Sequence, residues 1–130
     1  MNLDEHPGWS RAKAPVLAWY HATMAGFTAG MRQRAHLMMA ARWSLLWHTG
    51  LRETEHALDR WVERWGPFDN REEAELELLR VMAGAVPVQE GRRRNGLRSG
   101  EEWWAPAREG IVRLVVIEQV VVTVLPREAA

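Results

Sequence analysis

Two runs of β-branched residues near the C-terminus constrain the fold more than any other part of the sequence. They cover residues 111–117 and 120–125 and are separated only by Glu118 and Gln119. Two strand-like runs joined by two residues predict a β-hairpin. Pro126 is expected to end the second strand, because proline lacks the N–H group that a sheet requires. A domain that contains this segment is therefore expected to contain an antiparallel sheet.

The chain before this hairpin carries two clear helix signals. Thr54 is a suitable N-cap for a helix over residues 55–65, and Asn70 is a suitable N-cap for a second helix over residues 71–82. Glu73, three residues after Asn70, completes a capping-box-like pattern. The glycines expected to end the two helices are Gly66, which begins a Gly-Pro turn, and Gly84.

Between the second helix and the hairpin the pattern changes to strands and loop. Residues 86–90 and 101–105 are expected strands, whereas residues 91–100 contain three glycines and four arginines and are expected to form a loop. The order of helix, helix, strand, strand and hairpin predicts an α+β fold. We expect two helices packed on a small antiparallel sheet that ends in a β-hairpin, preceded by further N-terminal helices.

The first fifty residues differ in charge from the rest of the chain. No acidic residue lies between Glu5 and Glu53, although this stretch holds six basic residues. Two helices are expected here, one starting near Pro15 and one over residues 31–48. The sequence therefore divides into residues 1–50, a helical N-terminal extension or arm, and residues 51–130, the α+β domain.

Three interpretations of the N-terminal part are open. It is a helical hairpin packed on the domain, an extension outside the functional domain, or a targeting or membrane segment. The extension would imply that translation starts at Met31, Met38 or Met39. The membrane interpretation is disfavoured, because residues 14–31 are fewer than the ~20 that a spanning helix needs. Tyr20 and His21 also interrupt the apolar centre that a signal peptide requires.

Composition excludes several classes of protein. The chain has no cysteine, which removes disulfide scaffolds and thiolate metal sites. Its formal charge is zero and its pI is near 7.0, so nothing global draws it to nucleic acid or an anionic membrane. We expect one α+β domain in the cytoplasm, with no membrane segment.

The helix over residues 55–65 places three polar residues on one ridge. At 100° per residue, His56, Arg60 and Arg64 fall on the side opposite an apolar stripe. One interpretation is the solvated side of an ordinary amphipathic helix, on which acids pair with the arginines. The other is a site for RNA cleavage, which needs a group to move protons and cations to hold the phosphate.

The same region resembles a known group of proteins. A histidine followed by Ala-Leu and arginine, then Glu-Arg, Gly-Pro, an acidic second helix and a hairpin ending Val-Val-Thr-Val-Leu-Pro is similar to the RelE-like group of small bacterial and phage proteins. The resemblance covers about residues 53–126. Its matching residues are His56, Ala57, Leu58, Arg60, Glu63, Arg64, Gly66 and Pro67, and then Val121, Val122, Thr123, Val124, Leu125 and Pro126.

This resemblance implies a fold and an activity. The group shares a helices-on-antiparallel-sheet fold with barnase, EndoU and colicin RNases, and many of its members are ribonuclease toxins. Carried onto this sequence, it implies that His56 is the catalytic acid or base, that Arg60 holds the phosphate, and that Thr123 presents a hydroxyl to the same cleft. Arg64 would assist in binding the substrate.

Further candidate substrate-binding residues lie in the second half of the domain. The loop Arg92, Arg93, Arg94 and Arg98 is the densest basic patch and would release counterions on binding RNA. Trp103 and Trp104 follow it, and alternation along a strand predicts that one is buried and the other exposed for base stacking. Arg113 lies among apolar residues, an unusual position unless its side chain faces a cleft or solvent.

Two hypotheses for function follow. The first is a metal-independent endoribonuclease or RNA-binding protein without a cofactor, since the five histidines lack metal-ligand spacing and no phosphate-binding loop is present. The second is a non-catalytic module that binds another protein. Its partner would be an antitoxin, or a component of the ribosome or of a polymerase, and its role would be that of a phage-like regulator. The tryptophans and the neutral charge favour the second hypothesis, whereas the His-Arg ridge and the basic loop favour the first.

Overall fold

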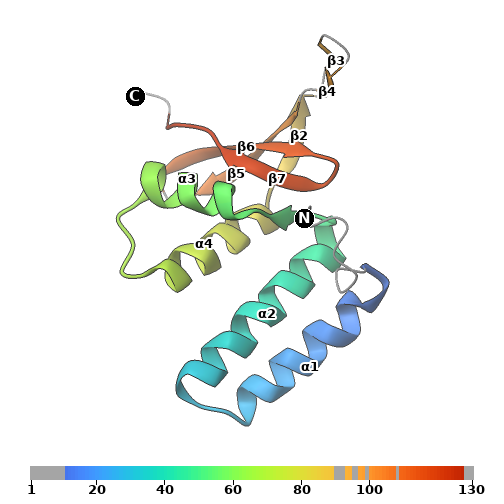
Figure 1. Ribbon diagram of the computed structural model, residues 1–130, viewed down its shortest axis with the longest axis vertical. Coiled ribbons are helices and arrows are strands. Elements are labelled where there is room, and N and C mark those ends of the chain that lie inside the picture. Colours follow the sequence, from blue (N-terminus) through green and yellow to red (C-terminus); the bar gives the residue numbers. More distant parts are fainter. Residues whose placement is uncertain (1–10, 90–92, 95–96, 99, 108, 128–130) are drawn as a thin grey trace. The chain divides into compact units, whose positions relative to one another are not determined.

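The computed structural model describes residues 11–89, 93–94, 97–98, 100–107 and 109–127 of the 130 residues (Figure 1). The chain forms two compact units, residues 1–52 and residues 53–130. Each unit is described by itself.

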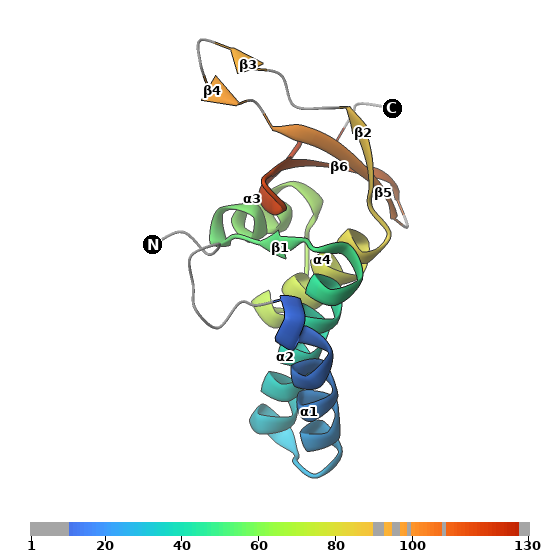
Figure 2. The ribbon, with the colours of Figure 1, turned by 90° about the vertical axis from the view of Figure 1, so that its right-hand side faces the viewer.

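The first unit is a pair of helices. Helix α1 (Ala14–Gly26) follows a short 3-10 turn, η2 (Arg11–Lys13), and runs antiparallel to α2 (Gly30–Thr49) (Figures 1 and 2). Ala14 of α1 packs with Trp43 and Leu46 of α2 to form the core of the unit. Both helices agree with the prediction from the sequence.

Two capped helices open the second unit. In α3 (Glu55–Trp65) the Thr54 hydroxyl accepts a hydrogen bond from the Ala57 N–H at 3.1 Å. In α4 (Arg71–Ala83) the Asn70 side-chain oxygen accepts one from the Glu73 N–H at 2.8 Å. Both N-caps were predicted and are confirmed, because Thr and Asn oxygens can satisfy N–H groups that have no partner within the helix.

A five-stranded sheet packs against these helices. Its strands are β1 (Arg52–Glu53), β2 (Val86–Gln89), β5 (Glu101–Ala107), β6 (Gly110–Ile117) and β7 (Val120–Val124), in the order β1-β7-β6-β5-β2. The pairs β2–β5, β5–β6 and β6–β7 are antiparallel. The turn between β6 and β7 has positive φ at both Glu118 and Gln119, as in the type I′ turn that matches the twist of a hairpin. The α+β fold class predicted from the sequence is confirmed.

The sheet has two chemically different faces. Alternate residues of β6, namely Val112, Leu114 and Val116, are buried. This is the face on which α3 and α4 pack, with Ala57, Leu58, Trp61 and Trp65 of α3 also buried. The indole N–H of Trp61 donates to the Ala74 carbonyl oxygen at 2.9 Å and ties α3 to α4. The helices therefore cover only one face of the sheet, and the side chains that alternate with the buried ones lie on the other face.

Three strands were not predicted. Residues 91–100 were expected to be a loop, but β3 (Arg93–Arg94) pairs antiparallel with β4 (Leu97–Arg98) within them. The glycines and arginines gave no strand signal, because pairing of two-residue strands depends on the turn between them rather than on hydrophobic periodicity. Strand β1 was also missed, since two polar residues carry no alternating pattern.

Candidate functional site

The predicted ridge on α3 lies on the exposed side of that helix. His56 is exposed, and Arg60 makes an ion pair with Glu63 one turn further along. Asp59 and Glu55 of α3 both bind Arg71, at 2.7 and 2.9 Å, and hydrogen bonds to these two carboxylates raise the pKa of Arg71 above its usual value. The acids beside the ridge thus hold arginines in ion pairs, which is the arrangement expected of a solvated helix face.

Arg64, the third ridge residue, has a structural contact. Its Nη1 donates a hydrogen bond to the Val124 carbonyl oxygen on β7 at 2.6 Å. The Thr54 hydroxyl likewise donates to the Val121 carbonyl oxygen at 2.9 Å. The bond of Arg64 joins residues 60 apart in the sequence, and that of Thr54 joins residues 67 apart. These bonds fasten the two ends of α3 along the last strand. Arg64 therefore uses at least one of its donors to hold the fold together.

Thr123 lies on the face of the sheet opposite α3. It pairs with Val115, which alternates with the buried residues Leu114 and Val116 of β6. Residues directly opposite each other on paired strands project to the same face, so Thr123 and Val115 both point away from the helices. The structure does not bring Thr123 together with His56, and the composite site expected from these two residues is not formed.

The side of the sheet away from the helices does gather other predicted residues. We call it the open face, because none of its described members is fully buried. It consists of Val86, Glu102, Trp104, Ile111, Arg113, Val115 and Thr123, which the register of β2, β5, β6 and β7 places on one side.

Trp104, Arg113 and Glu102 form a connected group on the open face. Trp104 and Arg113 are directly opposite each other on β5 and β6. The indole N–H of Trp104 donates to Glu102 Oε1 at 3.1 Å, and Arg113 Nη1 lies 3.6 Å from the same oxygen. Arg113 Nη2 also donates to the Pro126 carbonyl oxygen at 3.2 Å. The predicted exposed tryptophan is Trp104, which is 38% exposed, whereas Trp103 is half-buried.

Glu102 was not predicted from the sequence. Its signal was present, since Glu102 and Trp104 are two residues apart on one strand and so share a face. Recognising it required the register of β5 against β6, which places Glu102 opposite Val115, two residues from Arg113 and on the same face as Arg113. A carboxylate, a guanidinium and an indole thereby meet in one group.

The arginine-rich segment lies between β2 and β5 in the chain. The backbone of Arg93 and Arg94 forms β3, and that of Arg98 lies in β4, whereas Arg92 falls outside the described residues. This segment connects β2, the strand at one edge of the sheet, with its neighbour β5 (Figures 1 and 2). Its described arginines, Arg93, Arg94 and Arg98, are therefore close in the chain to β5, the strand that carries Trp104.

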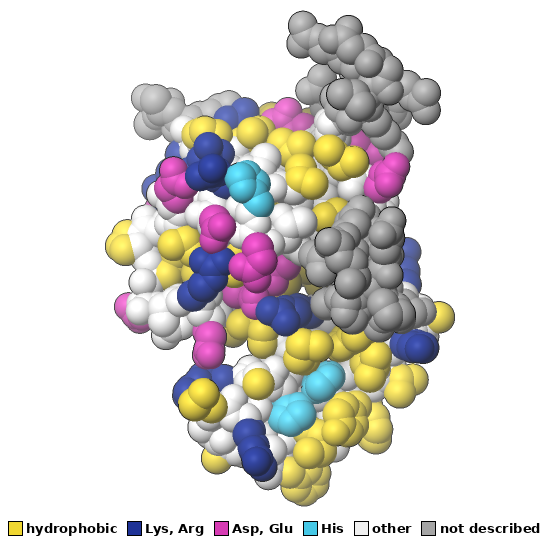
Figure 3. Space-filling view, viewed as in Figure 1, with side chains coloured by type: hydrophobic (Ala, Val, Ile, Leu, Met, Phe, Trp, Pro, Cys, Tyr) yellow, Lys and Arg dark blue, Asp and Glu magenta, His cyan; other side chains and the backbone are white. Residues whose placement is uncertain are grey.

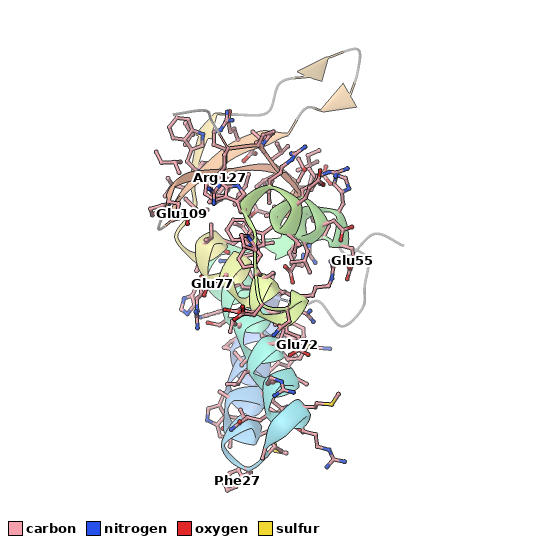
Figure 4. The ribbon with its side chains drawn as sticks, turned by 90° about the vertical axis from the view of Figure 1, so that its left-hand side faces the viewer. Phe27, Glu55, Glu72, Glu77, Glu109 and Arg127 are labelled. Carbon is pink, nitrogen blue, oxygen red and sulfur yellow. The ribbon has the colours of Figure 1, made fainter. Side chains whose placement is uncertain are left out.

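The C-terminal segment packs against the second unit through Arg127. Arg127 makes an ion pair with Glu109 (Figure 4). Its guanidinium lies over the Trp65 ring, 4.3 Å from the ring centroid. Trp65 also stacks on Trp61. A cation held against an indole in this way stabilises the packing of the chain end.

A separate polar cluster lies within the helical hairpin. His21 of α1 and His36 of α2 are joined by a hydrogen bond between their Nδ1 atoms, 2.9 Å apart. Burial lowers the pKa of His21 below its usual value, and the neighbouring His36 lowers it further. Among the described residues, no group of three or more metal-ligating side chains is found. The histidine pair is therefore a link between the two helices.

Comparisons with known proteins give no identification. No protein family, curated protein or solved structure matches the chain. Within the described part of the chain, every helix is too short or too polar to cross a bilayer.

Proposed function

We propose that residues 53–130 bind single-stranded RNA across the open face of the sheet. The observation that carries the proposal is the group of Trp104, Arg113 and Glu102, which supplies a stacking surface, a cation and a hydrogen-bond acceptor on adjacent strands. A helix pair packed on an antiparallel sheet is also what a RelE-like relationship implies, and that relationship is part of the proposal.

Each member of the group suits one part of a nucleotide. An exposed indole stacks on a base, which contributes about 1–3 kcal/mol per base in single-strand binding proteins. Arg113 can contact a phosphate, since a guanidinium offers paired donors to anionic oxygens. The Glu102 carboxylate can accept a hydrogen bond from a ribose hydroxyl or a base amino group. Thr123, beside Val115 on the same face, offers a further hydroxyl.

The distribution of charge along residues 53–130 favours some positions for the RNA phosphates over others. Residues 53–130 hold 11 arginines against 15 acidic residues, a formal charge of −4. Four of these arginines are concentrated between residues 92 and 98. We therefore expect the phosphates to contact the arginine-rich segment, residues 92–98, and Arg113 rather than to cross α3 and α4, whose acids would repel them.

The test is binding of fluorescently labelled single-stranded RNA to the full chain and its variants. Trp104→Ala is expected to weaken binding by about tenfold, because one stacking contact is lost. Trp47→Ala removes a similarly exposed tryptophan from α2 and is expected to leave the affinity unchanged. Arg113→Ala is expected to weaken binding, whereas Arg80→Ala on α4 is the matched arginine control.

Two outcomes contradict the proposal. The first is failure of the full chain to bind RNA at low salt. The second is equal loss of affinity in Trp104→Ala and Trp47→Ala. In either case the exposed Val86, Trp104 and Ile111 would instead favour the non-catalytic hypothesis, in which the open face docks on a protein such as an antitoxin.

Metal-independent cleavage of the bound RNA is a second candidate function, favoured by the position of Glu102 next to Arg113. A carboxylate can take the proton from the ribose 2′-hydroxyl while a guanidinium stabilises charge on the phosphate. The 2′-oxygen would then attack the phosphorus and break its bond to the 5′-oxygen. The described residues of the open face include no histidine, tyrosine or lysine to protonate that leaving oxygen, so water would supply the proton and cleavage is expected to be slow.

Cleavage has its own test. RNA is incubated with the full chain in the presence of a chelator, and fragments are measured over time. Glu102→Gln is expected to abolish cleavage while RNA binding is retained, and His56→Ala is expected to have no effect. If cleavage depends on His56 and not on Glu102, the catalytic site lies on the exposed side of α3 and not on the open face.

A further inference from the structure

The α1–α2 hairpin has an apolar surface that faces solvent. Helix α1 contains no charged residue, and Val16, Trp19 and Tyr20 on it are 65%, 68% and 46% exposed. At 100° per residue these three positions fall on one side of the helix, opposite the side that packs on α2. Figure 3 shows hydrophobic side chains gathered along α1.

The connection between the helices extends this surface. Phe27 is 83% exposed and Met31 is 77% exposed, and Phe27 projects from the end of the hairpin (Figure 4). Large apolar side chains that share one surface at such exposures are uncommon unless something covers them. We call the surface formed by Val16, Trp19 and Tyr20 of α1, with Phe27 at the end of the hairpin, the α1 surface.

Cations flank both ends of α1. Arg11 and Lys13 precede the helix, and Arg32 and Arg34 follow the connection; all four are exposed. Residues 6–52 hold six basic residues and no acidic residue, and the whole of residues 1–52, with Asp4 and Glu5 included, has a formal charge of +4. An apolar surface with basic side chains at its ends is complementary to a surface whose outer groups are anionic and whose interior is apolar.

We propose that the α1 surface binds the interface of an anionic lipid bilayer, with α1 lying parallel to the membrane. Tryptophan and tyrosine prefer the interfacial region, where an apolar ring body meets a polar tip. Arginine and lysine side chains extend toward lipid phosphates, each contributing about 1 kcal/mol near an anionic surface. Apolar residues on one side and basic residues beside them are typical of helices that lie on membranes.

The length of α1 fixes its orientation. Its 13 residues rise about 20 Å at roughly 1.5 Å per residue, whereas the hydrocarbon core is about 30 Å thick. The helix therefore lies along the interface and does not cross it, in agreement with the lack of a spanning helix among the described residues.

A second copy of the chain is a less suitable occupant of this surface. A symmetric contact through α1 would bring two sets of Arg11, Lys13 and Arg32 close together with no acidic residue between 6 and 52 to offset them. Like charges in such an interface oppose association, whereas lipid phosphates neutralise them.

The test is co-sedimentation of the full chain with vesicles. We expect binding to vesicles of phosphatidylglycerol and phosphatidylcholine, weaker binding when salt is raised, and little binding to phosphatidylcholine alone. Phe27→Glu is expected to lower binding by about tenfold or more, from the lost burial of one large apolar side chain. Val62→Glu on α3, at a 37% exposed position, adds the same charge and is expected to bind as the unaltered chain does.

Phe27→Ala separates the apolar contribution from the added charge and is expected to fall between Phe27→Glu and the unaltered chain. Circular dichroism verifies that each variant is folded. The proposal is overturned if the full chain does not sediment with anionic vesicles at low salt, or if Phe27→Glu binds them as tightly as Val62→Glu. It is also overturned if the chain is a dimer without lipid and Trp19→Glu makes it monomeric, because a second copy then covers the α1 surface.

Discussion

The hydroxyl of Thr54 makes two hydrogen bonds, and its removal is expected to destabilise the second unit more than removal of an ordinary helix cap. It accepts from the Ala57 N–H at 3.1 Å and donates to the Val121 carbonyl oxygen at 2.9 Å. Thr54→Val removes both bonds while keeping the branched shape. Loss of an N-cap costs about 1 kcal/mol, and loss of a hydrogen bond to a part-buried carbonyl costs about 1 kcal/mol more.

Two control variants isolate the second bond. The Asn70 side chain accepts the cap bond from the Glu73 N–H and makes no second hydrogen bond within the described part of the chain, so Asn70→Ala is expected to cost about 1 kcal/mol, half the effect of Thr54→Val. Thr54→Ser keeps the hydroxyl and is expected to retain most of the stability. In a unit of this size, about 2 kcal/mol lowers the melting temperature by roughly 10 °C.

The assay is urea-induced unfolding of the full chain, followed by hydrogen exchange in peptides from residues 53–130. The exchange readout assigns the loss to the second unit, since peptides from residues 11–52 are expected to be unaffected. The reasoning is refuted if Thr54→Val is no less stable than Asn70→Ala. That result would mean that the bond from α3 to β7 contributes nothing.

Three further predictions concern the core, a close contact and the histidine pair. Leu114→Ala, at a fully buried position, is expected to cost about 2–5 kcal/mol in urea unfolding, against little change for Ile111→Ala on the open face. Gly100→Ala is expected to lower the melting temperature, because its new Cβ would overlap with Val115 Cγ1, whereas Gly26→Ala, which has open space around it, is expected not to. His21 has a lowered pKa in the folded chain, so below its ordinary pKa of about 6.5 the unfolded chain binds more protons. The helical hairpin is therefore expected to lose stability as the pH falls through about 6.5, as measured by circular dichroism in urea, and His21→Gln is expected to reduce this pH dependence.

Helices and strands were predicted correctly where their position depends on residues close together in the sequence. Thr54 and Asn70 were identified as caps because a side-chain oxygen there satisfies N–H groups within a few residues. The hairpin of β6 and β7 followed from its β-branched runs. The pairing of β3 with β4 did not follow, because nothing in Arg93, Arg94, Leu97 and Arg98 favours a strand without the turn that brings them together.

The site was less predictable than the fold. Strand alternation indicated one exposed tryptophan without saying whether it is Trp103 or Trp104. Thr123 was expected beside His56, but a shift of one residue on β7 decides which face a side chain occupies. That register is set by the pairing of Val115 with Thr123 and by an irregularity between Val115 and Val116, neither of which the sequence reveals.

The sequence by itself determined the helices, their caps, the terminal hairpin and the break in charge near residue 52, because these depend on interactions between residues close in the chain. Only the tertiary structure decided that α3 covers one face of the sheet while Glu102, Trp104 and Arg113 meet on the other. It also decided that Phe27 and Trp19 stay exposed on the α1 surface. Those outcomes depend on which strands pair, in which register, and which helix faces find a partner, and these are properties of contacts between distant residues.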